Sequence, residues 1–369
     1  MTYKVPFVDF PLQYRNLESE ITAAVKDVFT GGDYILRSQV RQFEENIASF
    51  LGTDYAVGVN SCTDAMMLSL RAAGIGPGDE VITVAHTFVA TIEAVVHCGA
   101  KPVLVDIGDD YNMDVSQLEA AISPKTKAVM PVHLNGRLCR MDRLMSIASK
   151  HNLIIIEDAA QALGAAFGGK KAGAFGLAGC FSFYPAKLLG GAGDGGMVVT
   201  NDKNIAEKIR LYRDHGRATK DDIALFGFNS RLDNIQAAVL NVKFRYLPQW
   251  IEKRRELAAV YDKNLSNIRQ LKLPPPPQNS GHYFDVFQNY VVRAEERDKL
   301  AAHLNECGIE TLISNPRPNH HQPALGLGEF RLPRTEQFAK EVISLPLHTE
   351  LNNEQVEFVT ESINDFYRG

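Results

Sequence analysis

The chain has 369 residues, of which 45% are hydrophobic and 22% are charged. This length predicts two to three domains, and the composition is that of a globular protein, which excludes a disordered or fibrous chain. The formal net charge is −5 and no segment concentrates positive charge, so nucleic acid and anionic membranes are disfavoured as partners.

The cysteines and the first residues indicate the cellular setting. The five cysteines are widely spaced and never form a C-x-x-C, which fits reduced thiols and predicts neither a disulfide framework nor a zinc site. His133, His282, His303 and His321 lack metal-ligand spacing, so no metal site is predicted. No apolar run is long enough for a signal peptide or a membrane span. We expect a soluble, cytoplasmic protein.

Short apolar runs alternate with helical patterns through the first two thirds of the chain. Runs of this kind, bounded by turns, predict strands that are buried on both faces. Their alternation with helices predicts a mostly parallel sheet with helices on both sides. The last two strands are joined by a glycine loop and should form a hairpin. The strands are expected at residues 55–59, 81–84, 102–106, 128–132, 153–157, 180–184 and 197–200, and the helices at 63–73, 87–98, 115–122 and 141–151.

The pattern changes after Asn229. A long amphipathic helix is predicted over residues 235–265, with a bend near Pro248. The four prolines at 274–277 indicate a stiff connector. A strand at 288–293 and helices at 297–307 and 352–367 are expected beyond it.

These elements predict two domains. A large α/β domain is expected over residues 1–240, with an N-terminal arm and helix over 1–35. A smaller α+β domain is expected over 241–369.

Two nucleotide-binding motifs are nearly present. Residues 191–196 satisfy G-x-G-x-x-G but precede a strand, whereas a dinucleotide fingerprint opens a helix. Residues 164–171 resemble a P-loop, but Lys171 stands where a serine or threonine must bind magnesium. Neither motif is predicted to bind a nucleotide.

Two charged residues are predicted at the ends of buried strands. Asp158 follows four apolar residues and Glu157, and the carboxyl ends of strands are where ligands bind in open α/β sheets. Taken alone, Asp158 could be a helix N-cap. Lys187 follows the apolar segment 181–186, where burial would favour its neutral amine for Schiff-base chemistry. Taken alone, it could be a lysine that reaches solvent.

Together, the aspartate and the lysine match the needs of pyridoxal phosphate, which takes a lysine for its aldehyde and an acid for its ring nitrogen. The polar turn at residues 60–65 opens a helix and would suit the phosphate. Ser182 offers a further hydroxyl, and Phe88 could stack on a planar cofactor.

At this point the chain resembles the DegT/DnrJ/StrS family of pyridoxal-phosphate sugar aminotransferases, which have the aspartate-aminotransferase fold (fold type I). The resemblance covers nearly the whole length. It is carried by V-P-F-V-D-F, F-E-E-N-I-A-S-F-L-G, E-D-A-A-Q-A, S-F-Y-P-A-K, G-D-G-G-M-V-V-T-N-D, N-S-R-L-D-N-I-Q-A-A-V-L and L-P-L-H.

The resemblance implies a role for each matching residue. Lys187 would bind the cofactor aldehyde as the catalytic residue, and Asp158 would pair with the ring nitrogen. Asn229 would reach the phosphate in the neighbouring subunit, which implies a homodimer with shared active sites. The other implied cofactor contacts are Gln161 at the phenolic oxygen, Phe88 in the stack, and Thr63, Cys62 and Ser182 at the phosphate; Arg231, His320 and Tyr184 are the implied substrate contacts.

The resemblance also implies the reaction. The amino group of L-glutamate would pass to a nucleotide-linked keto-sugar in ping-pong fashion, as in glycan, lipopolysaccharide or antibiotic biosynthesis. The G-D-G-G and N-S-R-L-D segments favour a 3-keto acceptor over a 4-keto acceptor. Three other readings stay open: a dehydrase, although known versions carry histidine in place of Lys187; a non-catalytic regulatory protein; and an amino-acid aminotransferase.

Some residues depart from the family pattern. Cys62 replaces a usual glycine in the phosphate turn, which requires that its φ be negative. Asn135 and Arg137 replace a tyrosine and a glutamine, and Asn315 replaces an aromatic residue. We expect these replacements near the substrate.

Overall fold

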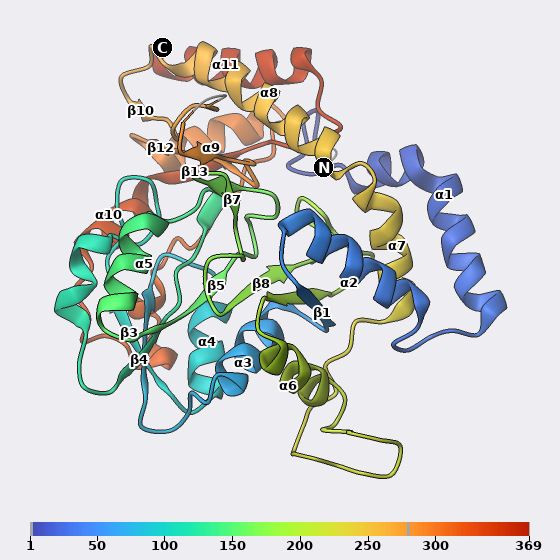
Figure 1. Ribbon diagram of the computed structural model, residues 1–369. Helices are drawn as coiled ribbons and strands as arrows, with labels where there is room; N and C mark the ends of the chain where they lie inside the picture. Colours follow the sequence, from blue (N-terminus) through green and yellow to red (C-terminus); the bar gives the residue numbers. More distant parts are fainter. Residues whose placement is uncertain (1–2, 279–280, 369) are drawn as a thin grey trace.

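The computed structural model describes residues 3–278 and 281–368, and its largest feature is a seven-stranded sheet (Figure 1). The strand order is β1-β9-β8-β5-β4-β2-β3, and only β9 runs antiparallel to its neighbours. The predicted mixed sheet and its hairpin are thus confirmed. The strands are β1 (Tyr55–Val59), β2 (Glu80–Val84), β3 (Lys101–Val105), β4 (Thr126–Val129), β5 (Ile154–Asp158), β8 (Ala178–Ser182) and β9 (Gly196–Thr200).

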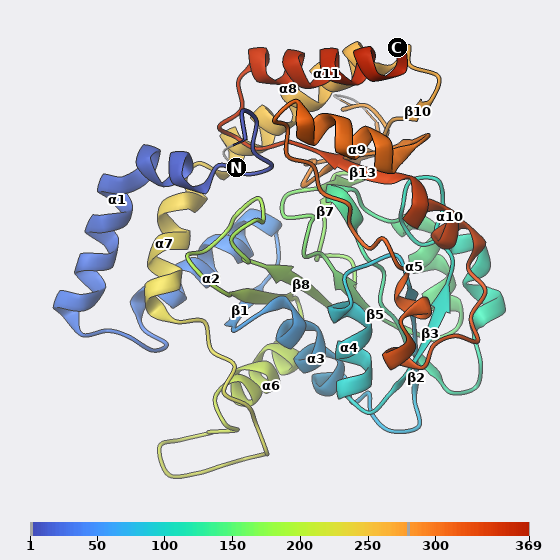
Figure 2. The ribbon, with the colours of Figure 1, turned by 180° about the vertical axis from the view of Figure 1, so that it is seen from behind.

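Helices cover both faces of the sheet, as the buried strands require. One apolar cluster packs α2 and α5 on one face, and another packs α3, α4 and α6 on the opposite face (Figures 1 and 2). The helices are α2 (Ser38–Leu51), α3 (Cys62–Ala72), α4 (Ala90–His97), α5 (Met141–Lys150) and α6 (Lys203–Arg213).

The helix predicted over residues 115–122 is wrong. Two 3-10 turns, η1 (Val115–Gln117) and η2 (Glu119–Ala121), occupy this segment. Asp114 caps the first turn, and the amides of Leu118 and Ala121 bond to carbonyls three residues earlier, so the segment closes as 3-10 turns instead of an α-helix.

The long helix predicted over residues 235–265 is two helices, α7 (Asn234–Phe244) and α8 (Leu247–Leu265). Pro248 lies in the first turn of α8, where a missing amide costs nothing. The proline that predicted a bend therefore begins a new helix.

The C-terminal part contains a second, antiparallel sheet in the order β10-β12-β13. Its apolar cluster also includes Val5, so the N-terminal segment packs on this part of the chain. The two-domain boundary at 240/241 stays a prediction. The elements are β10 (Leu271–Lys272), β12 (Tyr290–Ala294), α9 (Arg297–Glu306), β13 (Val342–Leu345) and α11 (Asn353–Arg368), whereas α10 (Pro333–Glu341), η4 (Asn319–His321) and η5 (Pro323–Leu325) belong to a segment that returns to the large sheet.

A small third sheet joins the two parts of the chain in the order β11-β6-β7. It consists of β6 (Ala166–Phe167), β7 (Lys170–Lys171) and β11 (Tyr283–Phe284).

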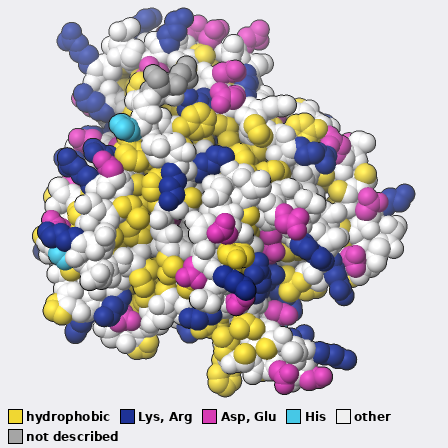
Figure 3. Space-filling model, viewed as in Figure 1, with side chains coloured by type: hydrophobic (Ala, Val, Ile, Leu, Met, Phe, Trp, Pro, Cys, Tyr) yellow, Lys and Arg dark blue, Asp and Glu magenta, His cyan; other side chains and the backbone are white. Residues whose placement is uncertain are grey.

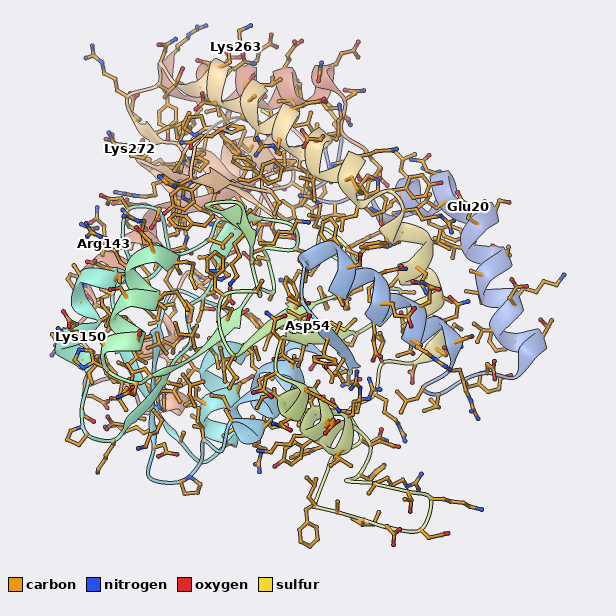
Figure 4. The ribbon with its side chains drawn as sticks, in the orientation of Figure 1. Glu20, Asp54, Arg143, Lys150, Lys263 and Lys272 are labelled. Carbon is orange, nitrogen blue, oxygen red and sulfur yellow. The ribbon has the colours of Figure 1, made fainter. Side chains whose placement is uncertain are left out.

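Two segments extend from the main body. Helix α1 (Phe10–Gly31) lies beside α7, and Glu20 on α1 binds Arg245 and Tyr246 (Figure 4). The loop after α6 projects furthest, with Ile223 59% and Phe226 100% exposed; hydrophobic side chains are visible on it in Figure 3. Among the described residues, no helix is long and apolar enough to cross a membrane.

Candidate active site

A cavity of about 500 Å³ opens where the carboxyl ends of β5 and β8 meet the C-terminal part of the chain. The strands β5 and β8 are neighbours, and Asp158 pairs with Cys180 in their register. The cavity brings together most of the predicted cofactor residues. Its lining includes Cys62, Thr63, Phe88, Asp158, Gln161, Ser182, Tyr184 and Lys187.

Asp158 is the last residue of β5 and is 5% exposed. Its Oδ2 accepts a hydrogen bond from Thr91 Oγ1 at 2.7 Å, and its Oδ1 accepts one from the Ala160 amide at 3.1 Å. Thr91 Oγ1 is in turn 2.7 Å from Thr87 Oγ1. The aspartate is therefore an acceptor held in a fixed position in the cavity. These contacts do not indicate that its main role is to cap a helix.

Lys187 lies in the loop between β8 and β9. Burial lowers the pKa of its ammonium group below the ordinary 10.5, while Cys62 and Asp158 act in the opposite direction. A lowered pKa favours the neutral form of the amine. Lys187, Cys62 and Asp158 all line the same cavity.

The polar turn before α3 forms a cradle for an anion. Ser61 caps the helix by accepting from the Asp64 amide, which leaves the Cys62 and Thr63 amides without an intrahelical acceptor. A Cβ on Gly196 would lie 2.3 Å from the Ser61 carbonyl, so only glycine lets β9 approach the turn. Cys62 is helical and not among the residues with positive φ, so it fits where a glycine is usual.

The remaining lining residues supply an aromatic wall and polar groups. Phe88 is 70% exposed, and Tyr184 is 55% exposed, as expected of rings that face an open cavity. Ser182 Oγ accepts from the Tyr184 amide at 3.3 Å. Gln161 Oε1 accepts from the Asn135 amide at 2.7 Å, an approach that uses a positive φ of 57° at Asn135.

Three of the predicted site residues lie outside the cavity lining. Asn229 is exposed at the base of the projecting loop, and Arg231 donates to Asp214 Oδ1 at 2.8 Å. His320 is buried and lies 3.2 Å from Glu336 Oε1. Their roles as cofactor or substrate contacts stay predictions.

His320, Glu336 and His321 together place three possible metal-ligand atoms within 4.8 Å of one another. Glu336 Oε1 accepts from the Leu332 amide and lies 3.2 Å from His320 Nε2 and 3.6 Å from His321 Nε2.

The residues that depart from the family pattern divide into two groups. Asn315 donates to the Thr87 carbonyl at 2.9 Å, which places it beside the connection between β2 and α4 that carries Phe88. Arg137 instead donates to Asp285 at 2.6 Å and stacks on Tyr283 at 3.6 Å, so it joins the two parts of the chain.

Sequence reasoning missed Thr91 and Gln288. Thr91 follows Thr87 by four residues, so the helix predicted over residues 87–98 would have placed the two hydroxyls on one face, and this spacing was the available signal. Gln288 lines the cavity from the segment before β12. It contacts the loop of Lys187, which is 100 residues away in the chain, so the sequence around Gln288 carries no sign of this contact.

These groups fit pyridoxal phosphate. A lysine with a lowered pKa, a buried carboxylate with oxygens fixed by hydroxyl and amide donors, and free amides at a helix N-terminus converge on one cavity. A lysine for the aldehyde, an acid for the ring nitrogen and an anion cradle are the groups that the cofactor requires. The fold and the cavity thus define a pyridoxal-phosphate enzyme of fold type I.

Comparison with known proteins narrows the class. Residues 15–364 match the DegT/DnrJ/EryC1/StrS aminotransferase family. The chain belongs to this family and is a pyridoxal-phosphate-dependent sugar aminotransferase.

Relatives match over nearly the whole chain. A "Pleiotropic regulatory protein" of Geobacillus stearothermophilus is 45% identical over 368 residues, 99% of either chain. The dTDP-3-amino-3,4,6-trideoxy-alpha-D-glucose transaminase of Streptomyces venezuelae is 42% identical over 369 residues, covering 99% of this chain and 97% of the relative. The crystal structure of S. venezuelae DesV in complex with a ketimine intermediate superposes with a TM-score of 0.96 at 42% identity, covering 100% of both chains.

Proposed function

We propose that the enzyme transfers the amino group of L-glutamate to C3 of a nucleotide-linked 3-keto sugar. The observation that carries this proposal is the transaminase of S. venezuelae, whose name places the amino group at C3. Relatives named for a 3-amino product share up to 42% identity with the chain, whereas a relative named GDP-perosamine synthase shares 37%. Amination at C4 is therefore the alternative.

Each residue of the cavity would have a separate role in the reaction. When bound, pyridoxal phosphate supplies an electron sink that stabilises negative charge at the substrate carbon. Lys187 Nζ takes a proton from the donor's α-carbon and returns one to the carbon that receives the amino group. Asp158 holds the ring nitrogen, and the amides of Cys62 and Thr63 hold the phosphate. Gln161 and Phe88 orient the ring from its sides.

The first experiment is spectroscopic. The pure protein supplied with pyridoxal phosphate should show a visible absorbance band, which should collapse when L-glutamate is added. Lys187→Ala should lack the band, whereas Lys203→Ala, at a lysine 71% exposed on α6, should keep it. No band in the wild type would refute the cofactor site. A band that ignores L-glutamate would refute the donor.

A panel of nucleotide-linked sugars decides the acceptor. The pyridoxamine form of the enzyme should regain the visible band with 3-keto sugars and not with the matching 4-keto sugars. The reverse preference would establish the C4 alternative. No response to any sugar would favour the regulatory reading.

We also propose a homodimer in which Asn229 contributes to the active site of the neighbouring subunit. The support is its place on an exposed loop outside the cavity of its own chain. Lys187→Ala and Asn229→Ala, each inactive or weak alone, should complement each other when mixed and refolded. Random pairing of equal amounts gives half mixed dimers with one intact site of two, so about a quarter of wild-type activity is expected. Failure to complement would contradict the shared site.

A further inference from the structure

One side chain from the C-terminal part holds the backbone on both sides of Lys187. Gln288 Oε1 accepts a hydrogen bond from the Leu188 amide at 2.7 Å, and Gln288 Nε2 donates to the Ala186 carbonyl at 3.0 Å. The side chain is buried, with an exposed fraction of 6%. Because an amide N–H only donates and a carbonyl only accepts, the partners fix the orientation of the glutamine amide and require both a donor and an acceptor from it.

The backbone of Gln288 is itself anchored. Arg254 Nη1 on α8 donates to the carbonyls of Phe287 at 3.2 Å, Gln288 at 3.1 Å and Leu347 at 2.8 Å. Arg254 is buried, and burial lowers the pKa of its guanidinium to about 10. The anchor thus connects α8, the segment before β12 and the segment after β13 at one point behind the glutamine.

A second glutamine contacts the same loop further from the lysine. Gln236 Oε1 on α7 accepts from the Ala192 amide at 2.9 Å, five residues beyond Lys187. It has one hydrogen bond to the loop, and neither flank of the lysine depends on it. Gln236 therefore provides a matched comparison for Gln288.

We propose that Gln288 is a positioning residue for Lys187. Its two hydrogen bonds fix the peptide groups of Ala186 and Leu188, and these groups set the direction in which the lysine side chain enters the cavity. Misplacement of a reacting group by about 1 Å costs up to about 100-fold in rate. The inference rests on the proposed role of Lys187, and Gln288 itself need not touch the cofactor.

The test measures how fast pyridoxal phosphate becomes attached to the apoprotein. Borohydride traps the attached cofactor, and peptide mapping identifies the modified lysine. Gln288→Met has a similar volume and neither hydrogen bond, so trapping at Lys187 should slow at least about tenfold. Gln236→Met should stay within about twofold of the wild type, because single distant contacts have small effects.

A kinetic measurement separates positioning from general damage. In Gln288→Met, kcat should fall about tenfold or more while the KM of the sugar acceptor changes less than about threefold, since the lysine acts in the chemical step. Gln288→Glu keeps an acceptor for the Leu188 amide, but its carboxylate cannot donate to the Ala186 carbonyl. Its trapping rate should therefore fall below that of the wild type and stay above that of Gln288→Met.

The outcomes distinguish the two proposals. Wild-type protein that is not trapped at Lys187 refutes the proposed cofactor site. Trapping at Lys187 in the wild type, with equal rates in Gln288→Met and Gln236→Met, overturns the positioning role alone. If Gln288→Met does not fold, Gln288→Glu is the deciding variant, and a wild-type trapping rate in it overturns the inference.

Discussion

The hydroxyl of Thr91 provides the most direct test of how the site is built. It is 1% exposed and donates to Asp158 Oδ2 at 2.7 Å. A hydroxyl has one proton, so Thr87, at 2.7 Å, donates to Thr91 in turn. Thr91→Val keeps the shape and removes these two hydrogen bonds, together with the longer contact of the hydroxyl to the Phe88 carbonyl at 3.2 Å. A bond to a charged group contributes about 1.5–3 kcal/mol and a neutral one about 0.5–1.5 kcal/mol, so the variant should lose about 2–4 kcal/mol of unfolding free energy.

Thr91→Ser is the matched control, because it keeps the hydroxyl and loses a buried methyl group. Its expected cost is about 1 kcal/mol. Urea titration of the two apoproteins measures the difference, and fluorescence titration measures the affinity for pyridoxal phosphate, which should fall more in Thr91→Val. The reasoning is refuted if the valine variant is as stable as the serine variant.

Two further predictions concern the lysine and the stacking ring. The lowered pKa of Lys187 means that the folded protein binds fewer protons than the unfolded chain between that pKa and 10.5, so wild-type apoprotein should gain stability as pH rises through this window. Lys187→Met should lose that part of the pH dependence, and an unchanged slope between the two proteins would contradict the burial of the amine. Phe88→Leu should raise the dissociation constant of pyridoxal phosphate about 2–10-fold, as a loss of 0.5–1.5 kcal/mol implies. The ring is 70% exposed, so unfolding of the apoprotein should change by less than about 0.5 kcal/mol; a larger loss, with unchanged affinity, would show that Phe88 supports the fold instead.

Local patterns predicted the sheet and the positions of Asp158 and Lys187. Buried strands and the glycine loop are local signals, and the ends of the seven strands lie within three residues of their expected places. The incorrect helix at residues 115–122 shows the limit, because apolar spacing does not distinguish an α-helix from two short 3-10 turns.

The parts of the site that were missed depend on distant segments. Gln288 meets Leu188 across 100 residues of sequence, and Thr91 meets Asp158 across 67. No propensity or periodicity encodes such a pairing, since it exists only after the sheet has formed. The same is true of Gly196. Glycine is required there because a Cβ would collide with the backbone of Ser61, which follows the neighbouring strand β1.

The pairing of β5 with β8 has a consequence for how such enzymes could be altered. Asp158 lies opposite Cys180 in a continuous ladder, so the spacing of the acid and the lysine loop is set by the buried sheet. The cavity lining also includes Phe7, Leu312 and Ser314, which lie outside the named helices and strands. Exchange of these short segments between relatives could therefore change which acceptor binds, while Asp158 and the loop of Lys187 keep their positions at the strand ends.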